Sequence, residues 1–173
     1  VMTGRGKAFH AGNQPPFTME AFFRPPWIYP LMAWIFTMFM WIPGTSKQPL
    51  QRMTGHVQLI NHVLFSPDGR WVASASFDKA VKLWDGYTGT FVATMRGHVG
   101  PVYQIAWSAD SRMVVSGSKD STLKVWSVRT KKLELDLPGH ADEVFAVDWS
   151  PMGTKAASGG KDKMLRPVRL AED

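Results

Sequence analysis

The dipeptide Gly-His recurs in this chain with a constant spacing of 42 residues, at Gly55-His56, Gly97-His98 and Gly139-His140. A serine, an aspartate and, in the first two repeats, a tryptophan return at the same spacing behind each histidine. These repeated positions are His56, Ser74, Asp78 and Trp84, then His98, Ser116, Asp120 and Trp126, then His140, Ser158 and Asp162. Because a period of about 40 to 45 residues suits a four-stranded blade of a β-propeller, the sequence predicts a series of such blades.

Each repeat has the pattern of four short strands joined by turns. Apolar residues stand four, seven and nine positions after the first histidine, at Ile60, Val63 and Phe65, and the other repeats keep these spacings. Side chains on one face of a strand are an even number of residues apart, but the fourth and seventh positions are three apart. This odd spacing predicts one extra residue, a β-bulge, in the first strand. A helical solenoid is excluded, since its apolar residues would recur with a period of about 3.6. In the first repeat the later strands are predicted at residues 71–77, 80–85 and 91–95.

The fold class predicted from these repeats is all-β, a partial β-propeller. Residues 49–53 align with the fourth strand at 91–95 and are expected to form one orphan strand without a blade. Two full blades follow, and the third repeat is expected to stop after its third strand, near Arg169. Because propellers close with typically four to eight blades, residues 46–173 are interpreted as the C-terminal blades of a larger ring.

Residues 1–45 have a different composition and stay unassigned, being rich in Pro, Trp and Met with an apolar run at 27–42. This run is shorter than the roughly 18 to 20 residues that cross a bilayer, and Pro30 interrupts its start, so no membrane span is predicted. No secretory signal is predicted either, because no small-residue cleavage site follows the run. We interpret the segment as non-native to the domain, for example a misjoined stretch, with a membrane-surface or partner-binding helix as the alternative. Such a helix would align Trp27, Leu31, Trp34, Met38 and Trp41.

The formal net charge is +6, with the lysines and arginines spread along the chain. Because the charge is spread, we interpret it as serving solubility. The alternative is that the basic side chains converge on one face after folding and bind RNA or acidic proteins. The chain has no cysteine, which excludes disulfides and thiolate zinc sites. No metal-binding spacing or phosphate loop is present, so we expect neither a metal nor a cofactor.

The recurring serine, histidine and aspartate are also the residue types of a hydrolytic triad. An enzyme needs one such site, whereas this set returns in three repeats. We therefore predict no catalytic residue and a structural relay instead. The aspartate would accept from one histidine nitrogen, the other nitrogen would accept from the serine, and the serine oxygen would accept from the indole N–H. Ser76 and Ser118 compete for the serine role, but Gly160 stands at their place in the third repeat, which favours the other set.

The third repeat departs from the pattern at its end. Val168 stands where the tryptophan is expected, and Pro167 precedes it. The indole donor is therefore missing, and the proline removes a ladder N–H, which an edge strand tolerates and an interior strand does not. The last blade is predicted to be the weakest unless its final strand stays at a sheet edge.

These residues resemble the WD-repeat family, whose repeats begin with Gly-His and end with Trp-Asp, a pattern complete from Gly55-His56 to Trp84-Asp85. Trp126-Ser127 is a common variant of the ending. The resemblance covers residues 47–169 and implies a propeller that acts as a non-catalytic interaction scaffold. Residues 74–86 and 137–151 are further similar to the C-terminal blades of the Notchless family.

The Notchless resemblance implies a role in assembly of the large (60S) ribosomal subunit. The implied partners are proteins of the pre-60S particle, with ribosomal RNA as a further candidate, in the nucleus and nucleolus, with the cytoplasm as the alternative location. That family engages the AAA ATPase midasin through a ubiquitin-like domain, which residues 1–45 do not resemble. The competing interpretation is another WD-repeat adaptor, such as a ubiquitin-ligase substrate receptor or a chromatin-complex subunit.

WD-repeat propellers bind partners mainly on their narrow face, and two kinds of position in each repeat would point there. One is the bulge residue five positions after each histidine, and the other is the residue before each turn aspartate. Aromatic side chains at such positions serve as interface anchors. The predicted partner-binding residues are Asn61, Phe77, Tyr103, Lys119, Glu143, Phe145 and Lys161.

Overall fold

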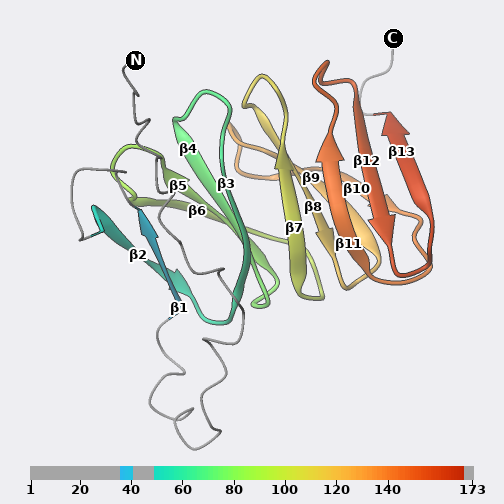
Figure 1. Ribbon diagram of the computed structural model, residues 1–173, viewed down its shortest axis with the longest axis horizontal. Coiled ribbons are helices and arrows are strands. Elements are labelled where there is room, and N and C mark those ends of the chain that lie inside the picture. The colour runs from blue at the N-terminus through green and yellow to red at the C-terminus, as the bar shows by residue number, and fades with distance from the viewer. Residues whose placement is uncertain (1–35, 41–48, 170–173) are drawn as a thin grey trace, which may run out of the picture. The chain divides into compact units, whose positions relative to one another are not determined.

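The structure is a computed structural model that describes residues 36–40 and 49–169, and all regular structure in these residues is β-strand. The strands form four antiparallel sheets (Figure 1). The predicted all-β class is therefore confirmed. The strands are β1 (Phe36–Met40), β2 (Gln51–His56), β3 (Ile60–Phe65), β4 (Trp71–Ser76), β5 (Ala80–Asp85), β6 (Phe91–Arg96), β7 (Val102–Trp107), β8 (Met113–Ser118), β9 (Thr122–Ser127), β10 (Leu133–Pro138), β11 (Val144–Trp149), β12 (Lys155–Gly160) and β13 (Leu165–Arg169).

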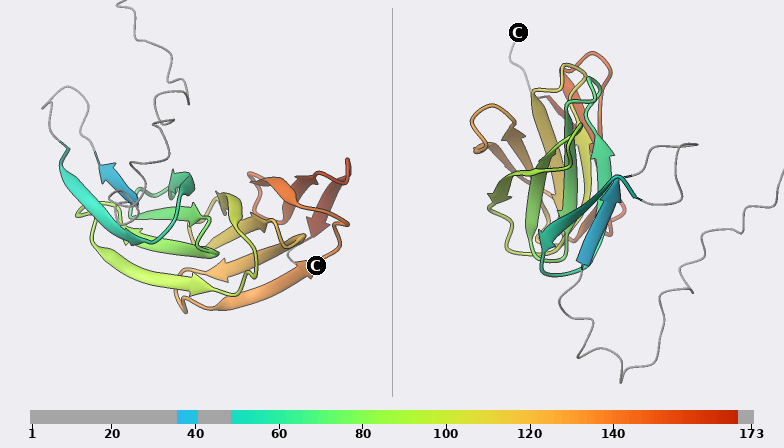
Figure 2. Two further views of the ribbon diagram at one scale, coloured as in Figure 1. Left: turned by 90° about the horizontal axis from the view of Figure 1, so that it is seen from below. Right: turned by 90° about the vertical axis from the view of Figure 1, so that its left-hand side faces the viewer.

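Each 42-residue repeat forms one sheet in which sequential strands are neighbours. Strands β3 to β6 make the first blade, β7 to β10 the middle blade, and β11 to β13 the three-stranded last blade. The blades follow one another in chain order (Figure 2). Two complete blades and a three-stranded one are what the sequence predicts.

The first strand of every blade contains the predicted bulge. The register with the second strand shifts between Ile60 and His62, and it shifts at the matching places in β7 and β11. The extra residue of each bulge is Asn61, Tyr103 or Phe145. This irregularity is what turns these three side chains away from the alternating pattern of the strand.

Strand β2, expected to be an orphan, instead pairs antiparallel with β1. Met38 in β1 pairs with Met53 in the same way that Val81 in β5 pairs with Met95 in β6. Since Met95 stands 42 residues after Met53, β1 takes the position of a third strand in a preceding blade.

Of residues 1–45 the structure describes only 36–40, which form β1, and the interpretation of the whole segment as non-native stays a prediction. The sequence of this strand, FTMFM, is apolar except for one threonine, which hides the alternation by which a strand is recognised. Met38, part of the expected helical stripe, lies in a strand, and the other four stripe residues lie outside the described residues. No helix long and apolar enough to cross a membrane occurs within 36–40 and 49–169.

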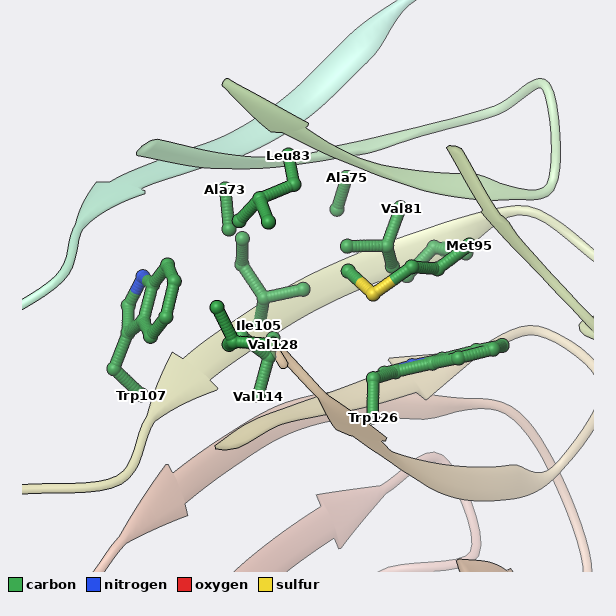
Figure 3. Close-up of a cluster of buried hydrophobic side chains, with 11 residues drawn as sticks. Ala73, Ala75, Val81, Leu83, Met95, Ile105, Trp107, Val114, Trp126 and Val128 are labelled. Atoms are coloured by element: carbon green, nitrogen blue, oxygen red, sulfur yellow. The ribbon is translucent and has the colours of Figure 1, made fainter. Parts of the chain in front are cut away.

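The core lies between successive blades rather than inside any one of them. Side chains of the first blade interdigitate with those of the middle blade, as Val81 and Met95 do with Trp126 (Figure 3). A second cluster joins the middle blade to Val144, Val147 and Trp149 of the last blade. A third joins Met40 and Met53 to the opposite face of the first blade. The first-to-middle cluster contains Ala73, Ala75, Val81, Leu83, Met95, Val102, Ile105, Trp107, Val114, Trp126 and Val128.

Candidate interaction site

The polar residues of the first repeat meet in one buried relay. His56 Nδ1 lies 2.7 Å from Asp78 Oδ2, and His56 Nε2 lies 2.8 Å from Ser74 Oγ. Trp84 Nε1 donates to the same Ser74 oxygen at 2.9 Å. A single tautomer fits all three contacts, because Nδ1–H donates to the carboxylate while Nε2 accepts from the serine hydroxyl.

The middle blade repeats this relay. His98 lies 2.9 Å from Asp120 and 2.8 Å from Ser116, which accepts from Trp126 Nε1 at 2.8 Å. Ser76 and Ser118, the competing serines, instead donate to backbone carbonyls of the loops before β3 and β7.

The last blade keeps the relay only in part. His140 lies 2.9 Å from Asp162 and 2.8 Å from Ser158. Val168 supplies no indole donor, so Ser158 lacks the contact that its counterparts make. The third relay is therefore one hydrogen bond shorter than the other two.

Each relay aspartate also organises the turn between the second and third strands. Asp78 Oδ1 accepts from the backbone N–H of Ala80 at 3.1 Å, and Oδ2 accepts from that of Val57 at 3.2 Å. The residue after the aspartate takes a left-handed conformation, with φ of 66° at Lys79. The carboxylate thus ties the histidine, the preceding loop and the tight turn together.

Burial sets the protonation state of the relay. It lowers the pKa of His56 and of His98 because it disfavours the imidazolium, and the neighbouring carboxylates do not overcome this effect. Burial alone would raise the pKa of Asp120, but hydrogen bonds from Thr122 and His98 outweigh it and bring the pKa to about 2. Near neutral pH each of the first two relays therefore holds a neutral imidazole beside an ionised carboxylate.

The three relay serines are buried. Ser74 and Ser116 have 0% of their surface exposed, and Ser158 has 1%. Within 36–40 and 49–169, every buried side-chain nitrogen or oxygen has a hydrogen-bond partner. A buried network whose polar atoms are all hydrogen-bonded stabilises its blade.

The predicted partner-binding residues gather where the three blades meet. The rings of Phe77 and Tyr103 have centroids 6.0 Å apart, and those of Tyr103 and Phe145 have centroids 5.0 Å apart. Glu143 accepts from the Tyr103 hydroxyl at 2.8 Å, and Lys119 Nζ lies 3.8 Å from the other Glu143 oxygen. We call these five residues the aromatic row.

The aromatic row is built from parts of all three blades. Phe77 follows β4, Tyr103 lies at the bulge of β7, and Phe145 lies at the bulge of β11. Burial and the nearby Glu143 carboxylate raise the pKa of Tyr103 to about 12, so its hydroxyl remains a donor. Phe145 is 46% exposed and Lys119 is exposed, which leaves an aromatic ring and a cation open to a partner.

The other two predicted residues make different contacts. Asn61 Nδ2 donates to the carbonyl of Val102 at 2.7 Å and so links the first blade to the middle blade. Lys161 is exposed and its Nζ lies 3.5 Å from Asp142. Asn61 therefore acts first as a link between blades, and Lys161 extends the charged rim beside the aromatic row.

Two buried lysines were missed at the sequence level. Lys82 Nζ donates to Thr94 at 2.8 Å and lies 5.1 Å from the Phe91 ring centroid, while Lys124 Nζ donates to Asp136 at 2.6 Å. Both lysines stand at the same place in the repeat, two residues before the relay tryptophan. That recurrence was the signal that could have revealed them.

The sequence of the blades matches a known repeat. Residues 47–85, 89–127 and 131–166, more than half of the chain, match the family model of the WD domain, G-beta repeat. The chain belongs to the WD-repeat family. Proteins of the WD-repeat family are typically non-catalytic scaffolds, in keeping with the buried relays.

Three curated WD-repeat relatives share high identity with part of the chain. The Notchless protein homolog of Arabidopsis thaliana is 72% identical over 57 residues, which are 33% of this chain and 12% of that protein. Ribosome assembly protein 4 of Saccharomyces cerevisiae is 63% identical over 59 residues, 34% of this chain and 12% of that protein. Ribosome assembly protein 4 of Chaetomium thermophilum is 58% identical over 58 residues, 33% of this chain and 11% of that protein. The matched part is thus a small share of each relative.

Proposed function

We propose that this WD-repeat chain is a non-catalytic protein-interaction scaffold in the assembly of the large (60S) ribosomal subunit. The observation that carries the proposal is the 72% identity with the Notchless protein homolog over 57 residues. The fold alone would not support it, since WD-repeat propellers serve many unrelated functions. Identity this high extends beyond the buried positions that any propeller needs.

The proposed contact surface is the aromatic row. Interface anchors are enriched in aromatic residues, and their energy depends on burial against the partner. Phe145 and Lys119 are exposed, whereas Tyr103 is held in place by Glu143 and by its two ring neighbours. This arrangement offers a preorganised aromatic surface with a charged rim, and Lys161 and Asn61 lie at its margins.

The proposed partners are proteins of the pre-60S particle, with ribosomal RNA as a further candidate, and the proposed location is the nucleus and nucleolus. Support comes from the name of the yeast relative, Ribosome assembly protein 4. A midasin-type ATPase would be engaged through a ubiquitin-like domain rather than through these blades.

The test is co-sedimentation of the tagged chain with pre-60S particles on a density gradient. We expect the chain in the pre-60S fractions, and we expect Phe145→Ala to reduce this amount by about tenfold, the effect of losing an interface anchor worth about 1.4 kcal/mol. Tyr87→Ala is the matched control, because Tyr87 is 70% exposed in a turn away from the aromatic row. Absence from these fractions with stable binding to a ubiquitin-ligase adaptor or a chromatin complex would favour the alternative adaptor role.

A further inference from the structure

In the first two relays the tryptophan ring fills a slot between neighbouring sheets. A Cβ added at Gly97 would lie 3.0 Å from Cη2 of Trp126, and one added at Gly55 would lie 3.3 Å from Cη2 of Trp84. Each indole thus lies against the glycine of its own Gly-His pair. On its other side Trp126 packs with Val81 and Met95 of the preceding blade.

The same slot in the last blade is hollow. A Cβ added at Gly139 would meet no aromatic ring, and the nearest atom is Arg166 Nη1 at 3.6 Å. A cavity of about 400 Å³ lies here. Its walls correspond to those around Trp126, since Leu123, Leu137 and Gly139 stand 42 residues after Val81, Met95 and Gly97.

The hollow slot keeps the polar group that the missing indole would contact. Ser158 lines the cavity and is hydrogen-bonded to His140 Nε2 at 2.8 Å, as Ser116 is to His98. Because the serine proton is directed to the histidine nitrogen, a lone pair of Ser158 Oγ remains to accept from a donor inside the cavity. In the other blades that donor is Nε1 of the tryptophan.

The side chains around the cavity favour a flat aromatic ring over an anion or a cation. Leucine, proline and valine side chains make up most of the wall, and among residues 36–40 and 49–169 no carboxylate lines it. Arg166 also borders the cavity, at the repeat position of Lys82 and Lys124, whose side chains approach Gly55 and Gly97 beside the tryptophan rings. A guanidinium can stack on an aromatic face, so this wall suits a ring as well.

We propose that the cavity between β10 and β13 is a binding site for an indole ring, which enters the vacant tryptophan position and donates its N–H to Ser158 Oγ. The ring would lie between Leu137 and Gly139. This site is separate from the aromatic row and does not depend on the proposed role in ribosome assembly.

The test is a ligand-observed NMR titration of the full chain with 3-methylindole and 1-methylindole. The two probes have equal size and apolar area, but only 3-methylindole has an N–H to donate. We expect 3-methylindole to bind about twofold to twelvefold more tightly, the ratio that one net hydrogen bond of about 0.5 to 1.5 kcal/mol supplies. Equal affinities, or no binding of 3-methylindole, would overturn the proposal.

Protein variants locate the binding within the chain. Val168→Trp should fill the cavity from inside and abolish the binding of 3-methylindole. Val99→Trp is the matched control, because Val99 is 76% exposed and does not line the cavity, so binding should be unchanged. Undiminished binding to Val168→Trp would place the ligand elsewhere and refute the site.

A further arm distinguishes the source of the ring. N-acetyltryptophanamide carries the backbone of a tryptophan residue, whereas 3-methylindole does not. Binding of both probes supports the site and indicates a tryptophan side chain of another chain as a ligand. Binding of 3-methylindole alone supports the site for a small molecule.

Discussion

The middle blade and the first blade share one residue pattern but differ in burial. Ile105 and Trp107 of the middle blade are 0% and 8% exposed, whereas Val63 and Phe65, at the same places in the first blade, are 38% and 55% exposed. The first blade covers Ile105 and Trp107. Over the corresponding face of the first blade, the described residues place only β1 and β2. A blade face is therefore completed by its neighbour.

The last blade shows the same dependence on its opposite face. Leu123 in the middle blade is 3% exposed because the last blade packs against it, while its counterpart Leu165 is 76% exposed. The repeat sequence thus specifies strands and turns, while stacking of successive repeats supplies most of the buried apolar surface.

The largest difference between blades is expected for the residues that end their first strands. Trp107→Ala should lower the free energy of unfolding by about 3 to 5 kcal/mol, because it empties a space in the core between two blades. Phe65→Ala, the matched substitution in the first blade, should cost about 1 kcal/mol or less, because that ring is 55% exposed. Chemical denaturation of both variants measures the difference, and equal losses would mean that Phe65 is covered in solution.

The next difference concerns the relay histidines. His98→Ala leaves the buried carboxylate of Asp120 and the hydroxyl of Ser116 without their partner, so we expect a loss of about 3 kcal/mol. His140→Ala should cost about 1 to 2 kcal/mol, since its relay already lacks the indole contact. Denaturation midpoints of the two variants give the comparison, and a larger loss for His140→Ala would contradict the ranking of the blades.

The sequence was sufficient for the parts of the fold that repeat. The bulges at Asn61, Tyr103 and Phe145 follow from a change of parity that returns in every repeat, and the strand bounds follow from turn residues. Strand β1 was not predicted, because its apolar residues leave no alternation and its register is one residue out of the 42-residue period. The local sequence pattern does not identify β1, because the position of this strand is determined by its pairing with β2.

The sequence indicated that the residues of the aromatic row share one face but not which contacts they make, and their role in binding stays a prediction. Counting from each histidine placed Tyr103 and Phe145 on one face, yet the hydrogen bond of Tyr103 to Glu143 joins residues 40 positions apart. The packing of neighbouring blades determines that distance. The burial of Lys82 was missed for a related reason, since a lysine in a strand is ordinarily solvent-exposed, and here its ammonium donates to Thr94 on the adjacent strand.

A smaller effect is expected from restoring the relay in the last blade. Val168→Trp should raise the free energy of unfolding by about 0.5 to 2 kcal/mol, the usual range for filling a cavity. The added ring would give Ser158 the donor that Ser116 receives from Trp126. Thermal unfolding monitors the gain, and Val168→Phe is the matched control that fills the cavity without an N–H. Equal gains for both variants would show that the hydrogen bond contributes nothing.

The smallest effect is expected from pH. Burial lowers the pKa of His56 and His98 below the ordinary value of 6.5, so the unfolded chain binds protons at a higher pH than the folded chain does. Stability should therefore be full above about pH 7 and should fall as the pH drops through 6.5 toward 5, because protons favour the unfolded state. The pKa of Asp120, held at about 2, adds a further loss only below the ordinary aspartate value of 3.8. Burial lowers the pKa of His62 as well, so His98→Gln removes one of three such histidines and should reduce the slope of stability against pH between 7 and 5 by about a third. An unchanged slope in this variant would show that the pKa of His98 is the same in the folded chain as in the unfolded chain.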